Sequence, residues 1–127
     1  MNPRSVLIVD DDVDIREILA DMLAETGFEV TTACNGLEAI AAIRRMEVKP
    51  GVILLDLMMP VMDGYGFLRQ RHLDPDLASI PIAIFTAGHG VDRDRLGDDL
   101  PIVYKPFDVP QLLDVLRALS AGGESAA

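Results

Sequence analysis

Acidic residues stand at the ends of two apolar segments, and they are the first candidates for chemistry in this sequence. Asp10 and Asp11 follow the apolar residues 6–9, and Asp56 follows the apolar residues 52–55. An acidic residue that closes a buried strand needs a partner, because burying an unpaired charge is costly. If the two segments are neighbouring strands, the three carboxylates converge on an oxygen-lined pocket that suits Mg²⁺.

Two further polar residues end apolar segments later in the chain. Thr86 follows residues 82–85, and Lys105 follows residues 102–104. A simpler interpretation stays open, in which the acidic run 10–12 caps a helix in solvent and Lys105 forms a structural ion pair. The complementary chemistry of four strand ends, with carboxylates, a hydroxyl and an ammonium, favours one functional site instead.

Apolar runs and helical patterns alternate along the chain. Five short apolar runs predict strands at residues 6–9, 28–31, 52–55, 82–85 and 102–104. The segments between them carry apolar residues at helical spacing, with capping residues where helices would begin. This alternation predicts an α/β fold in which helices cover both faces of a parallel sheet. Ligands of such folds bind beyond the carboxyl ends of the strands, where the polar residues stand.

The composition limits the class of protein. The chain has 127 residues, of which 50% are hydrophobic and 25% are charged, and its net charge is −10. These values predict one folded domain over residues 1–121, followed by a flexible tail over residues 122–127. No apolar stretch approaches the ~20 residues that span a bilayer, and the negative charge opposes direct binding to nucleic acid.

The sequence also predicts where the protein acts. The first residues carry no export signal, and Cys34 is the only cysteine, so no disulfide can form within the chain. We therefore expect a cytoplasmic protein that does not contact membranes. We also expect it to be a monomer.

Four short motifs at the strand ends resemble those of one known family. They are Val-Asp-Asp at residues 9–11, Asp56 with Met59-Pro60 and Met62-Asp63-Gly64, Thr86-Ala87, and Lys105-Pro106-Phe107. With these motifs in this order, the chain resembles the receiver domain of two-component response regulators, in its stand-alone form, over residues 4 to about 120. The resemblance implies a flavodoxin-like (βα)5 fold, whose doubly wound parallel sheet has the strand order 2-1-3-4-5.

The resemblance implies a phosphoryl acceptor and a metal site. By this resemblance Asp56 accepts a phosphoryl group, and Mg²⁺, which Mn²⁺ can replace, is bound at the same place. Its ligands would be Asp11, Asp56 and the main-chain carbonyl of Met58. Asp10 would act mainly through a water on the metal.

The resemblance further implies that Thr86 and Lys105 contact the phosphoryl oxygens. Phosphoryl transfer depends chiefly on positioning and on neutralising charge, so Mg²⁺ and Lys105 would cancel the repulsion between Asp56 and an anionic donor. The implied donor is a sensor histidine kinase, a histidine phosphotransfer protein or a small phosphodonor. The phosphorylated domain would then act on a downstream protein target. It would not be an enzyme, although it would assist its own phosphorylation and dephosphorylation.

Two other functions are weighed against this one. A Mg²⁺-dependent aspartyl phosphohydrolase also uses an aspartate at a strand end, but it typically needs a second aspartate two residues later as a general acid. Met58 occupies that position here. A receiver-like scaffold that is never phosphorylated would gain nothing from clustering Asp10, Asp11 and Asp56.

Two features depart from the pattern of the family. Ile102 stands three residues before Lys105, where the family has an aromatic residue that swings inward, and Tyr104 shares its strand face. The segment 88–99 is short by roughly one helical turn and has little apolar pattern, so the fourth helix should be short or irregular. A shortened fourth helix argues against the partner contacts and dimers that the family forms at this face. His89 is interpreted as a loop residue in solvent.

Because Ile102 replaces the aromatic residue, we predict weak or unconventional coupling between phosphorylation and partner binding at this strand. The substitution Ile102→Ala should therefore reduce phosphorylation-dependent partner binding much less than substitution of Asp56 does. Fluorescence titration of each variant with the partner, after treatment with a phosphodonor and without it, measures this difference. Complete loss of the response in Ile102→Ala would contradict the hypothesis.

Overall fold

A single sheet of five parallel strands forms the centre of the computed structural model, which describes residues 2–87, 90–97 and 100–125. The strands are hydrogen-bonded in the order β2-β1-β3-β4-β5. They are β1 (Asn2–Val9), β2 (Glu29–Ala33), β3 (Pro50–Leu55), β4 (Ile82–Thr86) and β5 (Ile102–Tyr104). The predicted flavodoxin-like architecture and the strand order 2-1-3-4-5 are thereby confirmed.

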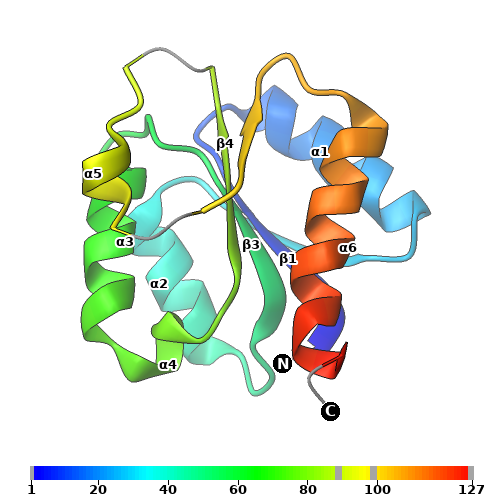
Figure 1. Cartoon of the computed structure of the whole chain (residues 1–127), viewed down its shortest axis with the longest axis horizontal. Helices are drawn as coiled ribbons and strands as arrows, with labels where there is room; N and C mark the ends of the chain where they lie inside the picture. The colour runs from blue at the N-terminus through cyan, green and yellow to red at the C-terminus, as the bar shows by residue number, and fades with distance from the viewer. Residues whose placement is uncertain (1, 88–89, 98–99, 126–127) are drawn as a thin grey trace.

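Helices cover both faces of the sheet, as Figure 1 shows. One face carries α1 (Val13–Glu25) and α6 (Val109–Ser125). The opposite face carries α2 (Gly36–Arg45), α3 (Gly64–Leu73), α4 (Pro75–Ala78) and α5 (Arg93–Leu96). None of the helices in the described part of the chain is long and apolar enough to cross a membrane.

Two apolar cores result from the alternation of side chains along the strands. Leu7 and Val9 of β1 face the core under α2 and α3, whereas Val6 and Ile8 face the core under α1 and α6. A strand that is buried on both sides needs apolar residues at successive positions. The continuous apolar character of residues 6–9 in β1, 52–55 in β3 and 82–85 in β4 therefore follows from the place of these strands in the middle of the sheet.

Polar residues just after the strands start the helices that follow. The carboxylate of Asp12 accepts hydrogen bonds from the backbone nitrogens of Asp14 and Ile15 at the start of α1. Asn35 caps α2 and Asp63 caps α3 in the same way. These caps satisfy backbone donors that a helix leaves unpaired, and they fix where each loop ends.

The connection between β4 and β5 contains a helix of four residues, α5, so the predicted shortening of the fourth helix of the family is confirmed. The short helix α4 after α3 was not predicted from the sequence. Helix α6 continues to Ser125, into the segment that the sequence predicts as a flexible tail. His89 lies outside the described residues.

Tyr65 of α3 connects this short helix to the rest of the domain. Its ring is buried, and its phenolic oxygen accepts a hydrogen bond from the backbone nitrogen of Asp92, 2.9 Å away, at the start of α5. The guanidinium carbon of Arg95 lies 4.1 Å from the centre of the same ring. Cation–π attraction and the hydrogen bond together hold α5 against α3.

The substitution Tyr65→Phe should loosen α5, because it removes this hydrogen bond and leaves the ring in place. A net loss of about 0.5–1.5 kcal/mol corresponds to roughly twofold to tenfold faster amide hydrogen exchange in residues 92–96. Hydrogen exchange followed by NMR measures the effect. Tyr104→Phe is the matched control, because Tyr104 is 47% exposed. Unchanged exchange in Tyr65→Phe would refute the role of this hydrogen bond.

Candidate functional site

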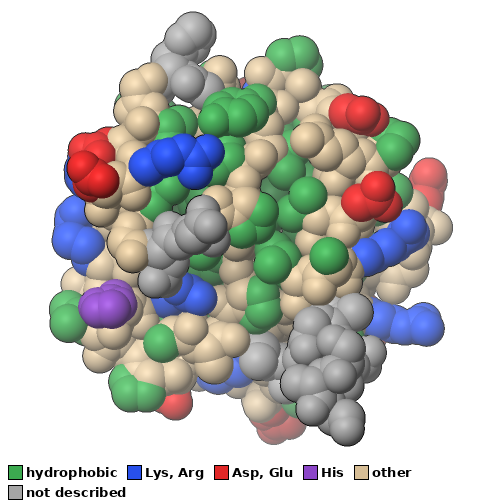
Figure 2. Space-filling model, in the orientation of Figure 1, with side chains coloured by type: hydrophobic (Ala, Val, Ile, Leu, Met, Phe, Trp, Pro, Cys, Tyr) green, Lys and Arg blue, Asp and Glu red, His purple; other side chains and the backbone are tan. Residues whose placement is uncertain are grey.

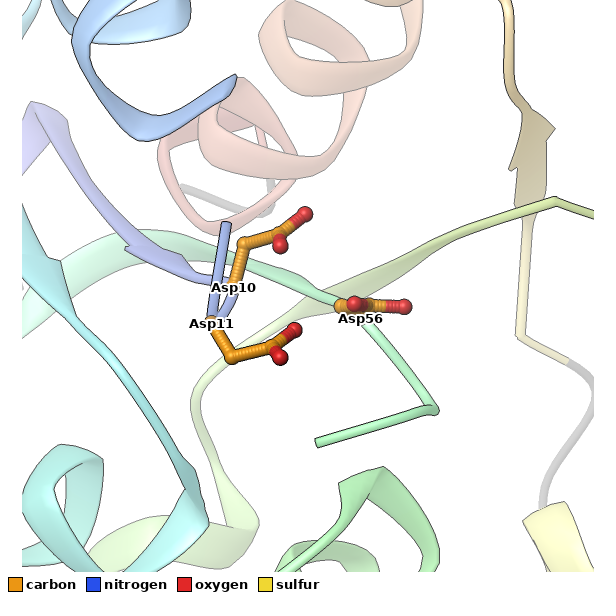
Figure 3. A group of neighbouring side chains, drawn as sticks. All are labelled: Asp10, Asp11 and Asp56. Carbon is orange, nitrogen blue, oxygen red and sulfur yellow. The ribbon is translucent and has the colours of Figure 1, made fainter. Parts of the chain in front are cut away.

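The carboxylates predicted to converge do so at the carboxyl edge of the sheet. Val9 pairs with Leu55 across β1 and β3, so the next residues, Asp10 and Asp56, leave the sheet side by side. Figure 3 shows Asp10, Asp11 and Asp56 pointing toward a common space. Each residue has an oxygen within 4.8 Å of an oxygen of the other two. Asp10 and Asp56 are buried, and Asp11 is exposed.

Asp10 is fixed by contacts on both of its carboxylate oxygens. Oδ1 accepts a hydrogen bond from the backbone nitrogen of Asp12 at 2.9 Å, and Oδ2 accepts one from Nζ of Lys105 at 2.9 Å. Its backbone carbonyl accepts a hydrogen bond from Nη1 of Arg16 at 2.8 Å. With 1% of its surface exposed, Asp10 is held by these partners instead of by water.

Lys105 brings positive charge to two of the three carboxylates. Its Nζ also lies 3.6 Å from Oδ2 of Asp56 and 5.0 Å from the centre of the Phe85 ring. Burial opposes the charged form of Lys105, but the hydrogen bond to Asp10 and the charges of Asp56 and Asp10 outweigh burial and raise its pKa. Lys105 therefore stays an ammonium and pairs with both carboxylates.

The carboxyl group of Asp56 has the most perturbed environment in the site. Burial and the neighbouring charge of Asp10 raise its pKa from 3.8 to about 6, against the opposing effect of Lys105. Its Oδ1 accepts a hydrogen bond from the backbone nitrogen of Met58 at 3.3 Å. One ammonium thus fails to balance the negative charge that the fold gathers around Asp56.

The donor set of this site fits a hard divalent cation. Three carboxylates supply only oxygen ligands, and the raised pKa of Asp56 shows that added positive charge would relieve the cluster. Asp11 and Met58 lie at the open side, where Met58 is 69% exposed. The thioether of Met58 is a soft ligand and does not match this set, whereas a main-chain carbonyl does.

The loop after Asp56 is held close to β3 by Gly64. A Cβ at this position would lie 2.6 Å from the backbone oxygen of Asp56 and 2.7 Å from Cα of Leu57, so any larger residue would push the loop away. The nitrogen of Gly64 donates to the backbone oxygen of Leu57 at 3.0 Å. Within this loop Val61 has a φ of 69°, a left-handed conformation that is unfavourable for a branched side chain.

The remaining predicted residues lie at the ends of β4 and β5. Thr86 is buried, and its backbone oxygen accepts a hydrogen bond of 2.7 Å from the backbone nitrogen of Lys105. Thr86 is also paired in register with Tyr104, whose side chain is half exposed to solvent. Ile102 is partly buried and packs against the core under α2 and α3.

Sequence reasoning missed two residues that support the site, Arg16 and Phe85. Arg16 lies in the first turns of α1 and binds the carbonyl of Asp10, and Phe85 lies beside the ammonium of Lys105. The only local signal for the role of Arg16 was its place, about one helical turn after the acidic residues 10–12. Phe85 gave none, because an aromatic residue in a buried strand is expected for packing alone.

The raised pKa of Asp56 predicts how stability depends on pH. Since folded Asp56 holds its proton up to about pH 6 and the unfolded residue only to about 3.8, stability falls as pH rises through that window. Without metal, Asp56→Asn should raise the free energy of unfolding by on the order of 2 kcal/mol above pH 7. This gain should shrink as pH falls below about 6.

Urea unfolding in the presence of EDTA, at several pH values, measures this dependence. Asp63→Asn is the matched control, because an amide caps α3 as a carboxylate does. Its stability should differ little from that of the wild type across the pH range. If Asp56→Asn gave no pH-dependent gain, the charge at Asp56 would be balanced in the folded protein.

Relatives with known names match nearly all of the chain. It is 40% identical over 123 residues to the probable transcriptional regulator ycf27 of Cyanophora paradoxa, covering 94% of this chain and 49% of that protein. It is 35% identical to the response regulator Rre1 of Synechocystis over an alignment 138 positions long, which covers 98% of this chain and 58% of that protein. The chain spans about half the length of the curated relatives it matches.

Solved structures share the fold. A CheY-like response regulator receiver domain protein of Methanospirillum hungatei is 30% identical with a TM-score of 0.83, and 95% of this chain and 97% of that one are covered. The receiver domain of the sensor histidine kinase PA1611 of Pseudomonas aeruginosa is 26% identical with a TM-score of 0.82, covering 93% and 98%. That structure has a magnesium ion coordinated in its active site cleft.

The sequence profile described as the response regulator receiver domain matches residues 6–117 of this chain. This match includes all the strand ends that form the site, from Asp10 to Lys105. The relatives, the solved structures and the profile agree on one family. The chain therefore belongs to the response regulator receiver domains of two-component signalling.

Proposed function

We propose that Asp56 accepts a phosphoryl group in a Mg²⁺-dependent reaction and that its phosphorylation switches contacts with other proteins. Receiver domains are regulatory phosphoacceptors and not enzymes in the ordinary sense, so family membership supports this role. One observation carries the proposal. The oxygens of Asp10, Asp11 and Asp56 lie within 4.8 Å of one another, and the ammonium of Lys105 touches this group.

The proposed reaction forms one bond and breaks one. An oxygen of the Asp56 carboxylate attacks the phosphorus of a phosphohistidine, the phosphorus–nitrogen bond breaks, and its electron pair stays on the imidazole, which takes up a proton from water. A carboxyl with a pKa of about 6 is mostly ionised at neutral pH, so the nucleophile is present. The product is an acyl phosphate, which water hydrolyses to restore the carboxylate.

The residues around Asp56 would mainly position the phosphoryl group and neutralise its negative charge. Lys105 lies 3.6 Å from Asp56 and would offset charge on the phosphoryl oxygens, and the hydroxyl of Thr86 would contact the same oxygens. Asp11, Asp56 and the main-chain carbonyl of Met58 would hold Mg²⁺, or Mn²⁺ in its place, with Asp10 nearby. The ion, when bound, lowers the repulsion between an anionic nucleophile and an anionic donor. The magnesium in the PA1611 receiver domain supports this assignment.

The donor would be a sensor histidine kinase, a histidine phosphotransfer protein or a small phosphodonor, and the output would be contact with a downstream protein. The relative Rre1 is itself named a response regulator, which supports such partners. Helix α1 and the loop after β5 border the site, so they are the surfaces that a donor must approach. We propose a cytoplasmic location for this exchange.

A phosphohydrolase is the second candidate, and the residue two positions after Asp56 argues against it. Such an enzyme needs a proton donor there for the leaving group. Met58 stands at that position with an exposed thioether, which has no proton to give. Without a proton donor at this position, the site would favour a lasting acyl phosphate on Asp56 over turnover of external substrates.

Treatment with acetyl phosphate and Mg²⁺, followed by intact mass measurement, tests the proposal. We expect one phosphoryl adduct on the wild type, no adduct on Asp56→Asn, and no adduct on the wild type when EDTA removes the metal before acetyl phosphate is added. Asp63→Asn, which changes the same charge in the same loop and keeps the cap of α3, should be phosphorylated like the wild type.

The alternatives give different results in the same experiment. Many turnovers of a phosphate ester without a lasting adduct would indicate a phosphohydrolase. No adduct with any donor, including a phosphorylated histidine phosphotransfer protein, would indicate a scaffold. An adduct on both Asp56→Asn and the wild type would place the acceptor elsewhere.

A further inference from the structure

A cavity of about 410 Å³ lies between α3 and α5, on the side of the molecule away from α1 and α6. We propose that it is a docking site for an acidic segment of a partner protein that carries a large apolar side chain. This inference does not depend on phosphorylation of Asp56. It rests on the shape of the cavity, on the apolar wall of the cavity and on the basic side chains that line it.

The cavity exists because α5 is too short to cover α3. Helix α3 has ten residues and spans about 15 Å, whereas α5 has four residues and spans about 6 Å. Figure 1 shows α5 beside only one end of α3. Within residues 2–87, 90–97 and 100–125, no helix covers the second half of α3 on this side, and Leu73 at its end is 75% exposed.

The wall of the cavity is apolar. Leu68 and Leu96 are buried at its base, and Leu73 lies exposed at its side. An exposed leucine beside a hollow of this size can gain contacts from an incoming apolar side chain, because burial of apolar surface is favourable. The cavity volume exceeds that of a single leucine or phenylalanine side chain, so such a residue can enter it.

The remaining side chains that line the cavity are basic, in a protein whose net charge is −10. They are Arg69, Arg71, His72 and Arg95. Figure 2 shows basic side chains together with a histidine over the side where α3 and α5 lie. The guanidinium groups of Arg69 on α3 and Arg95 on α5 line the same hollow and favour carboxylates over cationic groups.

Two of these arginines are held in place before any ligand arrives. Arg95 lies against the ring of Tyr65, and Arg71 donates from Nε and Nη2 to the backbone oxygen of Ile80 at 3.3 and 2.9 Å. A preordered wall lowers the entropy cost of binding. The nearby carboxylate of Asp74 is paired with the guanidinium of Arg44 at 3.1 Å.

NMR titration of the full unphosphorylated chain tests the proposal with a capped peptide of alternating aspartate and leucine, five residues long. We expect saturable shifts of the amides of residues 68–73 and 95–97. A peptide with lysine in place of aspartate should give no shifts there. A peptide with alanine in place of leucine should bind at least about fivefold more weakly, because it loses the apolar contact.

Charge reversal identifies the site. Arg69→Glu should weaken binding of the aspartate–leucine peptide by at least about fivefold, and Arg95→Glu is a second variant on the other wall. Arg93→Glu is the matched control, because it makes the same charge change on α5 but does not line the cavity. Its affinity should stay within about twofold of the wild type.

Several outcomes would overturn the proposal. They are shifts spread over other surfaces, equal binding of the lysine peptide, and unchanged affinity in Arg69→Glu. A dimer in sedimentation that Arg69→Glu abolishes would assign the cavity to a second copy of this chain, and preferential binding of a single-stranded oligonucleotide would assign it to nucleic acid. A protein that fails the acetyl phosphate experiment can still pass this one, so the two failures are distinguishable.

Discussion

The excess of negative charge at the carboxyl edge of the sheet is the constraint on which the site depends. Asp10 and Asp56 are nearly shielded from solvent, and Lys105 contacts both of them. Two buried carboxylates and one ammonium leave a net negative charge, which raises the pKa of Asp56. The fold tolerates this cost because hydrogen bonds satisfy Asp10. Such a cluster gains stability when positive charge enters, so its oxygens suit a cation.

The sheet makes this arrangement rigid. Asp10 and Asp56 leave neighbouring strands in register, and Thr86 and Lys105 are joined by a backbone hydrogen bond where β4 and β5 end. Backbone hydrogen bonds from Asp10 to Ala33 and from Asp56 to Val9 continue this pairing one residue past the strands. The loop that ends at Gly64 has close backbone contact with Asp56. Groups held on regular elements keep the precise geometry that phosphoryl transfer needs.

Local patterns in the sequence predicted a parallel sheet, and the family resemblance supplied the strand order that brings the acidic residues together. Apolar runs mark buried strands, and parallel strands bring their carboxyl ends to one edge. The contacts of Arg16 with Asp10 and of Tyr65 with α5 were not predictable, since each joins residues that no periodic pattern relates. Helix α6 extends to Ser125, into a segment whose glycines and small residues predict a tail. Local signals therefore predict elements, whereas individual side-chain pairs depend on how those elements pack.

The packing of β5, α3 and α5 determines which parts of the molecule are in physical contact with the acidic cluster. Ile102 has no ring to swing inward, and about half of the surface of Tyr104 is exposed to solvent. Helix α3 offers a second physical connection, because it begins at Gly64, against the backbone of Asp56, and its next residue, Tyr65, holds α5. A side chain at Gly64 would collide with the backbone of Asp56 and Leu57, so the start of α3 lies close to the acidic cluster. Because α5 is only four residues long, its position depends on Tyr65 more than a longer helix with its own apolar face would.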